Sequence, residues 1–283
     1  MKSKRRKRWY IGYALLVCAF ILFALGPILW SFIMSITPQT ELVGNTTRLL
    51  PVEATLGNYR TLFSSGNQQG TLFRSGMLNS LKEALVSLLI GIPISILCAY
   101  PLSRLKMRGT DATRNVLLFT MAIPVFATII PLYRMFATMN LLDNMFALIL
   151  VYVTSFLPLS VWLLISYFDT LPRELEEVAS LDGCGKFKTL LVIILPVSYP
   201  IIFADILIVF LTTWNMFQIP LILAPSSATK PIAVVVSEFV TKTSIDYGLM
   251  NAGGILALIP PAIIAIVFRR FLIQGIVGGA TKG

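Results

Sequence analysis

The chain alternates between long apolar runs and shorter polar segments that carry most of its charge. Each apolar run is long enough to form an α-helix that crosses the hydrocarbon core of a membrane, which takes about 20 residues. The pattern therefore predicts an all-α polytopic membrane protein. Its six predicted transmembrane helices lie within residues 11–36, 81–102, 116–136, 145–168, 190–224 and 249–271.

Prolines and glycines interrupt several of these runs. Pro124 and Pro131 fall inside the third predicted helix. Proline is tolerated there where neighbouring helices or water satisfy the freed carbonyls, so we expect this helix to face protein or a cavity. The first run is longer than the apolar region of a signal peptide, and no A-x-A cleavage site follows it. We expect it to be retained as the first span.

Residues 37–77 form a polar segment rich in Gly, Asn, Thr and Ser. Leu56, Tyr59, Leu62 and Phe63 recur within it at roughly helical spacing. Two interpretations stay open for this segment: a short amphipathic helix on the outer surface, or a mostly irregular loop.

Composition supports the membrane assignment. The 283 residues are 56% hydrophobic and 13% charged, with a mean hydropathy of +0.82, which excludes a soluble domain of this size. The net charge of +10 could suggest a nucleic-acid partner. The cations cluster in loops between apolar runs, so we predict no nucleic-acid binding. The chain has no histidine, and its three cysteines are far apart, so we predict no metal site.

The distribution of Lys and Arg predicts the orientation. With both termini in the cytoplasm, 16 of the 23 cationic side chains fall on the inner side, as the positive-inside rule requires. The predicted parts are then a basic cytoplasmic cap (1–10), the first transmembrane helix (11–36), an extracytoplasmic segment (37–77), a transmembrane core (78–272) with a cytoplasmic loop (169–189), and a cytoplasmic tail (273–283).

That cytoplasmic loop contains a polar island between two apolar runs. Pro172 suits the first turn of a helix, and Glu174, Glu176 and Glu177 suit the positive end of its dipole. Gly183 and Gly185 should end the helix in a sharp turn. The loop is thus predicted to be a short helix, a glycine turn and a second helix.

The loop does not bind nucleotide by the usual phosphate-loop motif. Residues 183–186 read G-C-G-K, but the motif needs G-x-x-x-x-G-K-[ST], and Ser180 and Phe187 stand where it needs a glycine and a Ser or Thr. We therefore predict that this chain binds no cofactor and that any ATP is used by a partner subunit.

Residues 177–183, which read E-V-A-S-L-D-G, followed by Ile194, Leu195 and Pro196, resemble the "EAA…G…LP" loop of ABC importer permeases. The sugar-importer subfamily reads E-A-A-x-x-D-G-A there, and this chain departs from it at Val178 and Cys184. An ordinary cytoplasmic loop is the alternative interpretation.

Other segments extend the resemblance from the second span to the C-terminus. Residues 104–109 resemble the family's R-x-x-x-R-G turn, and residues 123–133 resemble its third span. Residues 214–217 resemble W-N-E-F, with Met216 in place of the glutamate. Residues 271–275 and 279–283 resemble the ending of the G-type subunit of maltose importers, which points to the maltose/multiple-sugar type.

The resemblance implies a type I importer fold in a bacterial cell (inner) membrane. It implies a second, different permease, two ATPase subunits and an extracytoplasmic sugar-binding protein as partners. The expected ATPase-coupling residues are Glu177, Val178, Ala179, Asp182 and Gly183. The expected contacts to the binding protein are Pro225, Ser226, Ser227 and Lys230.

A sugar path needs aromatic faces and amides. The candidates are Trp214, Asn215 and Gln218, within about one helical turn, together with Tyr133 and Tyr152; packing between helices is an equally open role for each. A stand-alone channel and an integral-membrane enzyme are the competing functions. Asp205 is the main intramembrane acid available to an enzyme, and no second carboxylate lies at a span centre.

Overall fold

The structure is a computed structural model that describes residues 2–44, 49–105, 107–240 and 246–280. The last three residues of the predicted tail lie outside this range. The described residues form helices joined by turns, with no β-sheet among them. The chain divides into two compact units: Met1–Arg74 with Val235–Ile259, and Ser75–Val234 with Pro260–Gly283.

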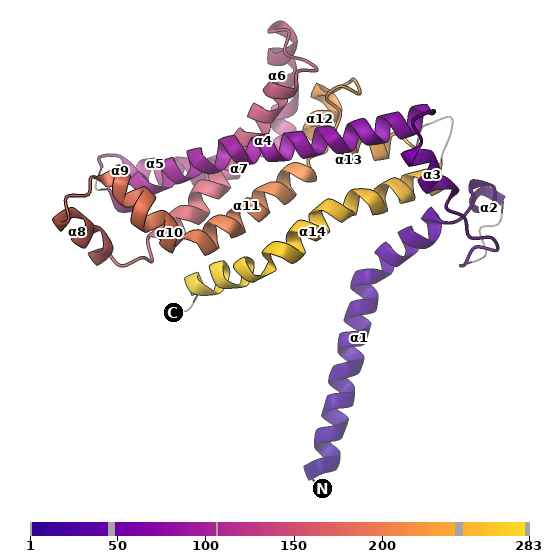
Figure 1. Cartoon of the computed structure of the whole chain (residues 1–283), viewed down its shortest axis with the longest axis horizontal. Helices are drawn as coiled ribbons and strands as arrows, with labels where there is room; N and C mark the ends of the chain where they lie inside the picture. The colour runs from indigo at the N-terminus through magenta and orange to yellow at the C-terminus, as the bar shows by residue number, and fades with distance from the viewer. Residues whose placement is uncertain (1, 45–48, 106, 241–245, 281–283) are drawn as a thin grey trace. The chain divides into compact units, whose positions relative to one another are not determined.

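Figure 1 labels the helices in chain order. Their bounds are α1 Lys2–Ser35, α2 Gln39–Gly44, α3 Gly57–Phe63, α4 Gln68–Arg104, α5 Thr110–Met121, α6 Val125–Thr138, α7 Met145–Phe168, α8 Glu174–Leu181, α9 Lys186–Thr189, a π-helix at Leu190–Ile194, α10 Leu195–Val197, α11 Tyr199–Trp214, α12 Gln218–Leu223, α13 Ile232–Ser237 and α14 Tyr247–Ala280.

Four of the described helices are long and apolar enough to cross a membrane, namely Gly12–Ser35, Gln68–Arg104, Met145–Phe168 and Tyr247–Phe271. Two bent helix pairs bring the total to six if each pair counts as one span. This agrees with the six predicted helices. The third and fifth spans, however, differ from simple rods.

The third predicted span is broken. α5 and α6 are bent by 92° relative to each other. Pro124 lies between them with an extended backbone (ψ 132°), and proline disfavours the helical conformation in the residue before it. Pro131 sits inside α6 without ending that helix. Of the two prolines, only Pro124 breaks the helix.

The fifth span is also bent, by 81° between the Lys186–Val197 helix and α11. A π-helical turn at Leu190–Ile194 precedes Pro196, and the bend follows at Ser198. α11 then ends at Trp214, and α12 begins only at Gln218. The apolar run at 190–224 is therefore three helical pieces rather than one long element.

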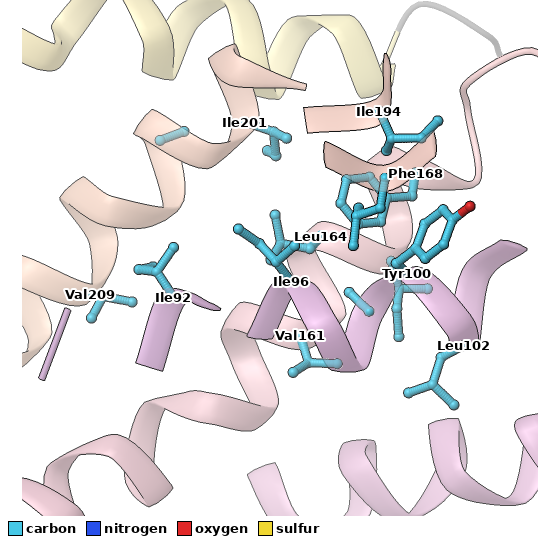
Figure 2. Close-up of a cluster of buried hydrophobic side chains, with 14 of the residues drawn as sticks. Ile92, Ile96, Tyr100, Leu102, Val161, Leu164, Phe168, Ile194, Ile201 and Val209 are labelled. Atoms are coloured by element: carbon cyan, nitrogen blue, oxygen red, sulfur yellow. The ribbon is translucent and has the colours of Figure 1, made fainter. Parts of the chain in front are cut away.

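The core of the larger unit lies between α4, α7 and α11. Figure 2 shows side chains of this cluster from all three helices, namely Ile92 and Ile96 of α4, Leu164 of α7 and Ile201 of α11. Gly91 of α4 lies against α7, where a β-carbon would be 2.4 Å from Cζ of Phe156. A glycine fits at this point because the β-carbon of any other residue would clash with the Phe156 ring.

The smaller unit contains most of the predicted extracytoplasmic segment, and both interpretations of it hold in part. α3 is a short helix whose Leu62 is fully buried, whereas Leu56 and Phe63 are exposed. The Tyr59 hydroxyl lies 2.7 Å from Oγ of Ser35, and Nδ2 of Asn58 donates to the Ser35 carbonyl at 2.8 Å. Irregular chain connects α2 to α3 where the structure describes it.

α4 begins about ten residues before the predicted core. The Asn67 side chain accepts a hydrogen bond from the Gly70 amide at 2.6 Å, as a helix N-cap does. The helix is 37 residues long, or roughly 55 Å at 1.5 Å per residue, which exceeds the hydrocarbon core. Its polar first turns therefore lie beyond the apolar span.

Candidate functional site

The glycine turn of the loop at residues 169–189 forms as the sequence predicts. Gly183 has φ +75°, the left-handed conformation that glycine adopts without strain. The Cys184 amide donates to the Ala179 carbonyl at 2.9 Å, and the Gly183 amide donates to the Ser180 carbonyl at 3.1 Å. This pair of bonds is the Schellman motif that ends a helix. Pro172, which we expected in the first turn, lies before the helix.

The side chains of α8 divide between its two faces. Val178 is 58% exposed and Leu181 is 88% exposed, and Glu177 also faces solvent. Asp182 caps the helix and is exposed. Ala179 is only 1% exposed, so within this chain its side chain is covered, unlike those of the other expected coupling residues. Its methyl group packs against the chain itself, and Leu181 stands in its place on the outward face.

Arg104, the last residue of α4, fixes this loop in position. Its Nε donates to Oε2 of Glu176 at 3.0 Å, and its other nitrogens donate to the carbonyls of Phe168, Leu171 and Pro172 at 3.0–3.1 Å. The Arg104 side chain is 2% exposed and that of Glu176 is 12% exposed. A buried guanidinium with four acceptors ties the start of α8 to the end of α4.

A second ion pair supports the same corner. Arg114 of α5 pairs with Asp169 at 3.2 Å and donates to the Leu102 carbonyl at 2.7 Å. Oγ of Ser103 donates to the same Asp169 carboxylate at 2.8 Å. The ends of α4, α5 and α7 are thus joined around the base of the loop.

The segment 225–231 is held by Asp143, which lies in the link between α6 and α7. The Asp143 carboxylate accepts hydrogen bonds from the Ser226 amide at 3.2 Å, from the Ser226 hydroxyl and from the Thr229 hydroxyl. The Asp143 amide donates to the Leu223 carbonyl at 2.9 Å. Asp143 itself has φ +60°, a conformation rare outside glycine, asparagine and aspartate.

α4 also holds the 225–231 segment, and we call its contacts and those of Asp143 the clamp. Nδ2 of Asn79 donates to the carbonyls of Ser227 and Lys230, both at 3.1 Å. Pro225 and Ser227 are exposed, whereas Ser226 and Lys230 are half-buried. Among the four expected contact residues, Ser226 uses its hydroxyl in the hydrogen bond to Asp143 that holds the loop. The loop presents a fixed backbone and the exposed Pro225 and Ser227.

The clamp should weaken in acid. Burial raises the pKa of Asp143, but the hydrogen bonds from Ser226 and Thr229 and the nearby Lys230 charge outweigh it and leave the pKa below its ordinary value of 3.8. A carboxyl whose pKa is lowered by folding contributes its full stability above that ordinary value. The contribution is lost as the pH falls through the lowered pKa.

At neutral pH, we expect Asp143→Asn to speed amide hydrogen exchange in residues 226–230. The amide removes the negative charge and places donors against the hydroxyls, which costs about 2 kcal/mol, or about thirtyfold in local opening. Asp111→Asn, at an exposed position in α5, is the matched control. Unchanged exchange in Asp143→Asn would show that the carboxylate does not hold the loop.

The five expected sugar-path residues differ in their exposure. Tyr152 and Trp214 are buried, with 0% and 4% of their surface exposed. Tyr133 is 43% exposed, and Gln218 is half-buried. Asn215 is exposed, and its Nδ2 donates to the Leu211 carbonyl at 2.9 Å. Because α11 ends at Trp214, the expectation that Trp214, Asn215 and Gln218 share one helical turn is wrong.

A groove of about 750 Å³ opens along α5, α6 and α7. Apolar side chains dominate its lining, including Met121, Leu132, Met135 and Leu150, and none of the five expected sugar-path residues is among them. Thr120, Thr128, Thr154 and Ser155 supply its few hydroxyls. Phe136 is its one aromatic side chain, and no Asn or Gln lines it, so the lining lacks the amides expected for sugar.

Asp205 is a packing residue rather than an accessible acid. Its carboxylate is 1% exposed and accepts a hydrogen bond from Oγ of Ser160 on α7 at 2.5 Å. The described residues contain no cluster of three or more potential metal ligands. Nothing in this surrounding resembles a catalytic site.

Two functional contacts escaped the sequence analysis. Arg104 and Glu176 are 72 positions apart, and Asp143 and Ser226 are 83 positions apart. Arg104 was assigned only to the R-x-x-x-R-G turn and to the inner cations, and Asp143 belonged to no motif. The one available signal was the position of both residues at the ends of predicted helices, where a charged side chain can hold a neighbouring loop.

Comparison with known proteins identifies the family. The model of the family described as "binding-protein-dependent transport system inner membrane component" matches residues 91–278. The chain is 30% identical to the trehalose/maltose transport system permease protein MalG of Thermococcus litoralis, over 95% of this chain and 96% of that protein. It is 28% identical to the trehalose transport system permease protein SugB of Mycobacterium tuberculosis, with both chains fully covered.

A solved structure shows the same fold. A chain of a bacterial ABC transporter involved in the import of alginate superposes with a TM-score of 0.78 at 22% identity, over 93% of this chain and 96% of that one. The predicted ABC importer permease fold is thereby confirmed. The chain belongs to the family of binding-protein-dependent transport system inner membrane components, which are multi-pass permease subunits and not enzymes.

Proposed function

We propose that this chain is one of two different permease subunits in an ATP-driven carbohydrate importer. In this proposal α8 transmits movement from one of two separate ATPase subunits, which bind and hydrolyse the ATP. The observation that carries the proposal is the buried Arg104–Glu176 pair, which links the exposed helix α8 directly to the long helix α4. A rigid link of this kind is what a coupling element needs.

The two ends of the larger unit support a division of labour. α8 lies at the opposite end of this unit from α12, beside which the 225–231 loop begins (Figure 1). The excess of Lys and Arg in the α8 loop and the basic N-terminus supports a cytoplasmic place for α8 and both termini. The 225–231 loop would then face the extracytoplasmic binding protein.

The substrate class follows from the relatives. The Thermococcus litoralis relative is a trehalose/maltose permease, and the Mycobacterium tuberculosis relative is a trehalose permease. A third relative, from Agrobacterium fabrum, is a sulfoquinovosyl glycerol permease at 28% identity. The substrates in these names are carbohydrates or contain one, which supports a carbohydrate substrate for this chain. Among the candidate path residues, the exposed Tyr133 and Asn215 remain available to touch it, whereas Tyr152 and Trp214 pack between helices.

The apolar groove on α5, α6 and α7 suits the second permease better than a sugar. Phe126, which is 69% exposed, and Ile130, which is 67% exposed, lie outside the groove lining but on the same helix α6. Together with the groove they can gain favourable contact with the apolar face of another helix. Such contacts are the usual basis of helix association within a membrane.

A reconstitution tests the proposal. The complex in proteoliposomes should take up sugar only with ATP inside and the sugar-loaded binding protein outside. ATP hydrolysis should rise when that protein is added. Sugar flux that needs no ATPase subunit would support the channel, and chemical conversion of the sugar would support the enzyme. Either result would overturn the proposed function.

Labelling tests the orientation separately. A cysteine at Ser227 should react with a membrane-impermeant maleimide added outside intact cells, and a cysteine at Val178 should react only after the cytoplasmic face is opened. Both positions are exposed in the structure. The three native cysteines are replaced first, because Cys18 and Cys98 are exposed as well. The reverse pattern would contradict the orientation.

A further inference from the structure

The inner end of the last span carries a cluster of four aromatic rings. Phe271 of α14 stacks on Phe203 of α11 with ring centroids 4.7 Å apart, and it meets Tyr199 edge-on at 6.0 Å. Phe268 lies 5.5 Å from Phe203. All four rings belong to the same compact unit, so this arrangement is part of its fold.

Arg270 is held over this cluster. The centre of its guanidinium lies 4.6 Å from the centroid of the Phe271 ring, a cation–π contact that orients the planar group. Neither Arg270 nor the adjacent Arg269 has an ion-pair partner in the part of the chain that the structure describes. Because the ring covers only a face of the guanidinium, the N–H donors along its edge remain available to an anion.

A cavity of about 480 Å³ lies at this place. It is lined by Tyr199, Phe203, Val267, Phe268, Arg270 and Phe271. The Tyr199 side chain is 49% exposed, so its hydroxyl can serve as a further donor. The cavity therefore combines apolar walls with donors for a single negative group.

A continuous apolar surface leads from the cavity along the span. Val267 is 58% exposed, Ile266 is 65% exposed and Ile263 is 55% exposed on α14. A ligand that places an anion beside Arg270 can thus extend hydrocarbon along these three side chains. This combination of charge and chain is that of a phospholipid.

We propose that this cavity binds the phosphodiester headgroup of an anionic membrane phospholipid, with Arg270 contacting the phosphate and an acyl chain lying against Val267, Ile266 and Ile263. Phe271 acts by orienting the guanidinium. The site goes beyond the transport function proposed above, because it does not depend on which substrate the chain carries.

The test uses the complete membrane complex, purified in detergent and stripped of lipid. Phosphatidylglycerol with a photoreactive acyl chain is titrated, and cross-links are mapped by mass spectrometry. We expect saturable cross-linking within residues 199–203 and 263–271. Phosphatidylcholine with the same chains should compete weakly. Inorganic phosphate at the same concentration should not compete, which separates a lipid from a free anion.

Two neighbouring arginines provide matched variants. Arg270→Gln should raise the concentration of phosphatidylglycerol needed for half-maximal cross-linking about fivefold, whereas Arg269→Gln should change it less than twofold. Arg270→Lys should fall between Arg270→Gln and the unchanged chain, because it keeps the charge but loses the planar contact. Equal effects of the two glutamine variants would show bulk attraction to the membrane and would overturn the site. Equal binding of phosphatidylcholine, or displacement by phosphate alone, would overturn it as well.

Discussion

Arg104→Met should uncouple transport while leaving the chain in the membrane. The change removes one member of a buried ion pair and leaves the Glu176 carboxylate and three carbonyl oxygens without their donor. Removing one partner of such a pair costs about 3–5 kcal/mol. We expect a lower thermal midpoint for the complex and a fall of at least about tenfold in sugar uptake per ATP hydrolysed, since α8 loses its fixed connection to α4.

A neighbouring arginine and a second substitution sharpen this experiment. Arg108 lies between α4 and α5 but is exposed, so Arg108→Met should leave both measurements nearly unchanged. Adding Glu176→Met to Arg104→Met should recover part of the lost stability, because it removes the unpaired buried carboxylate. If Arg104→Met transports normally, or if the two substitutions add without recovery, the pair does not fix the loop.

Gly183→Val should be the most damaging single change in the turn after α8. Gly183 has φ +75°, and no other atom lies within 4 Å of the place where its β-carbon would be. The cost is therefore backbone strain, roughly 1–2 kcal/mol and more for a β-branched side chain, and not a clash within this chain. We expect the last turn of α8 to unwind and ATPase stimulation by the loaded binding protein to be lost.

Two controls separate the turn from the surface around it. Gly183→Asn keeps the left-handed conformation, which asparagine tolerates, and should retain most of the stimulation. Gly185→Ala alters a glycine with φ −70° and open space around it, and should be neutral. Equal loss in Gly183→Asn and Gly183→Val would place the requirement in the contact surface instead of the backbone.

The sequence predicted the elements that rest on local pattern. The apolar runs long enough to cross a membrane predicted where the spans lie. The turn at Gly183 was predictable because glycine is one of the few residues that accept a positive φ. Pro124 indicated an interruption of the third span, but the sequence did not predict the 92° bend between α5 and α6. α6 packs against α12, and no local pattern encodes a contact between these two segments.

The exposure of the candidate site residues could not be predicted from local pattern, because burial depends on tertiary structure. Val178 and Ala179 are adjacent and both small, yet one is exposed and the other covered by the chain. The pairing of Arg104 with Glu176 needs the ends of α4 and α7 to meet, and the clamp on Asp143 needs two loops to meet. Residue type and spacing along the sequence did not indicate either of these tertiary contacts.

The most direct test of the account is which partner each loop touches in the assembled complex. A photoreactive phenylalanine analogue at position 181, the most exposed apolar side chain of α8, should cross-link to the ATPase subunit. The same analogue at position 227 should cross-link to the binding protein and not to the ATPase. Cross-linking of position 181 to the binding protein, or to no subunit while the complex hydrolyses ATP, would contradict the coupling role of α8.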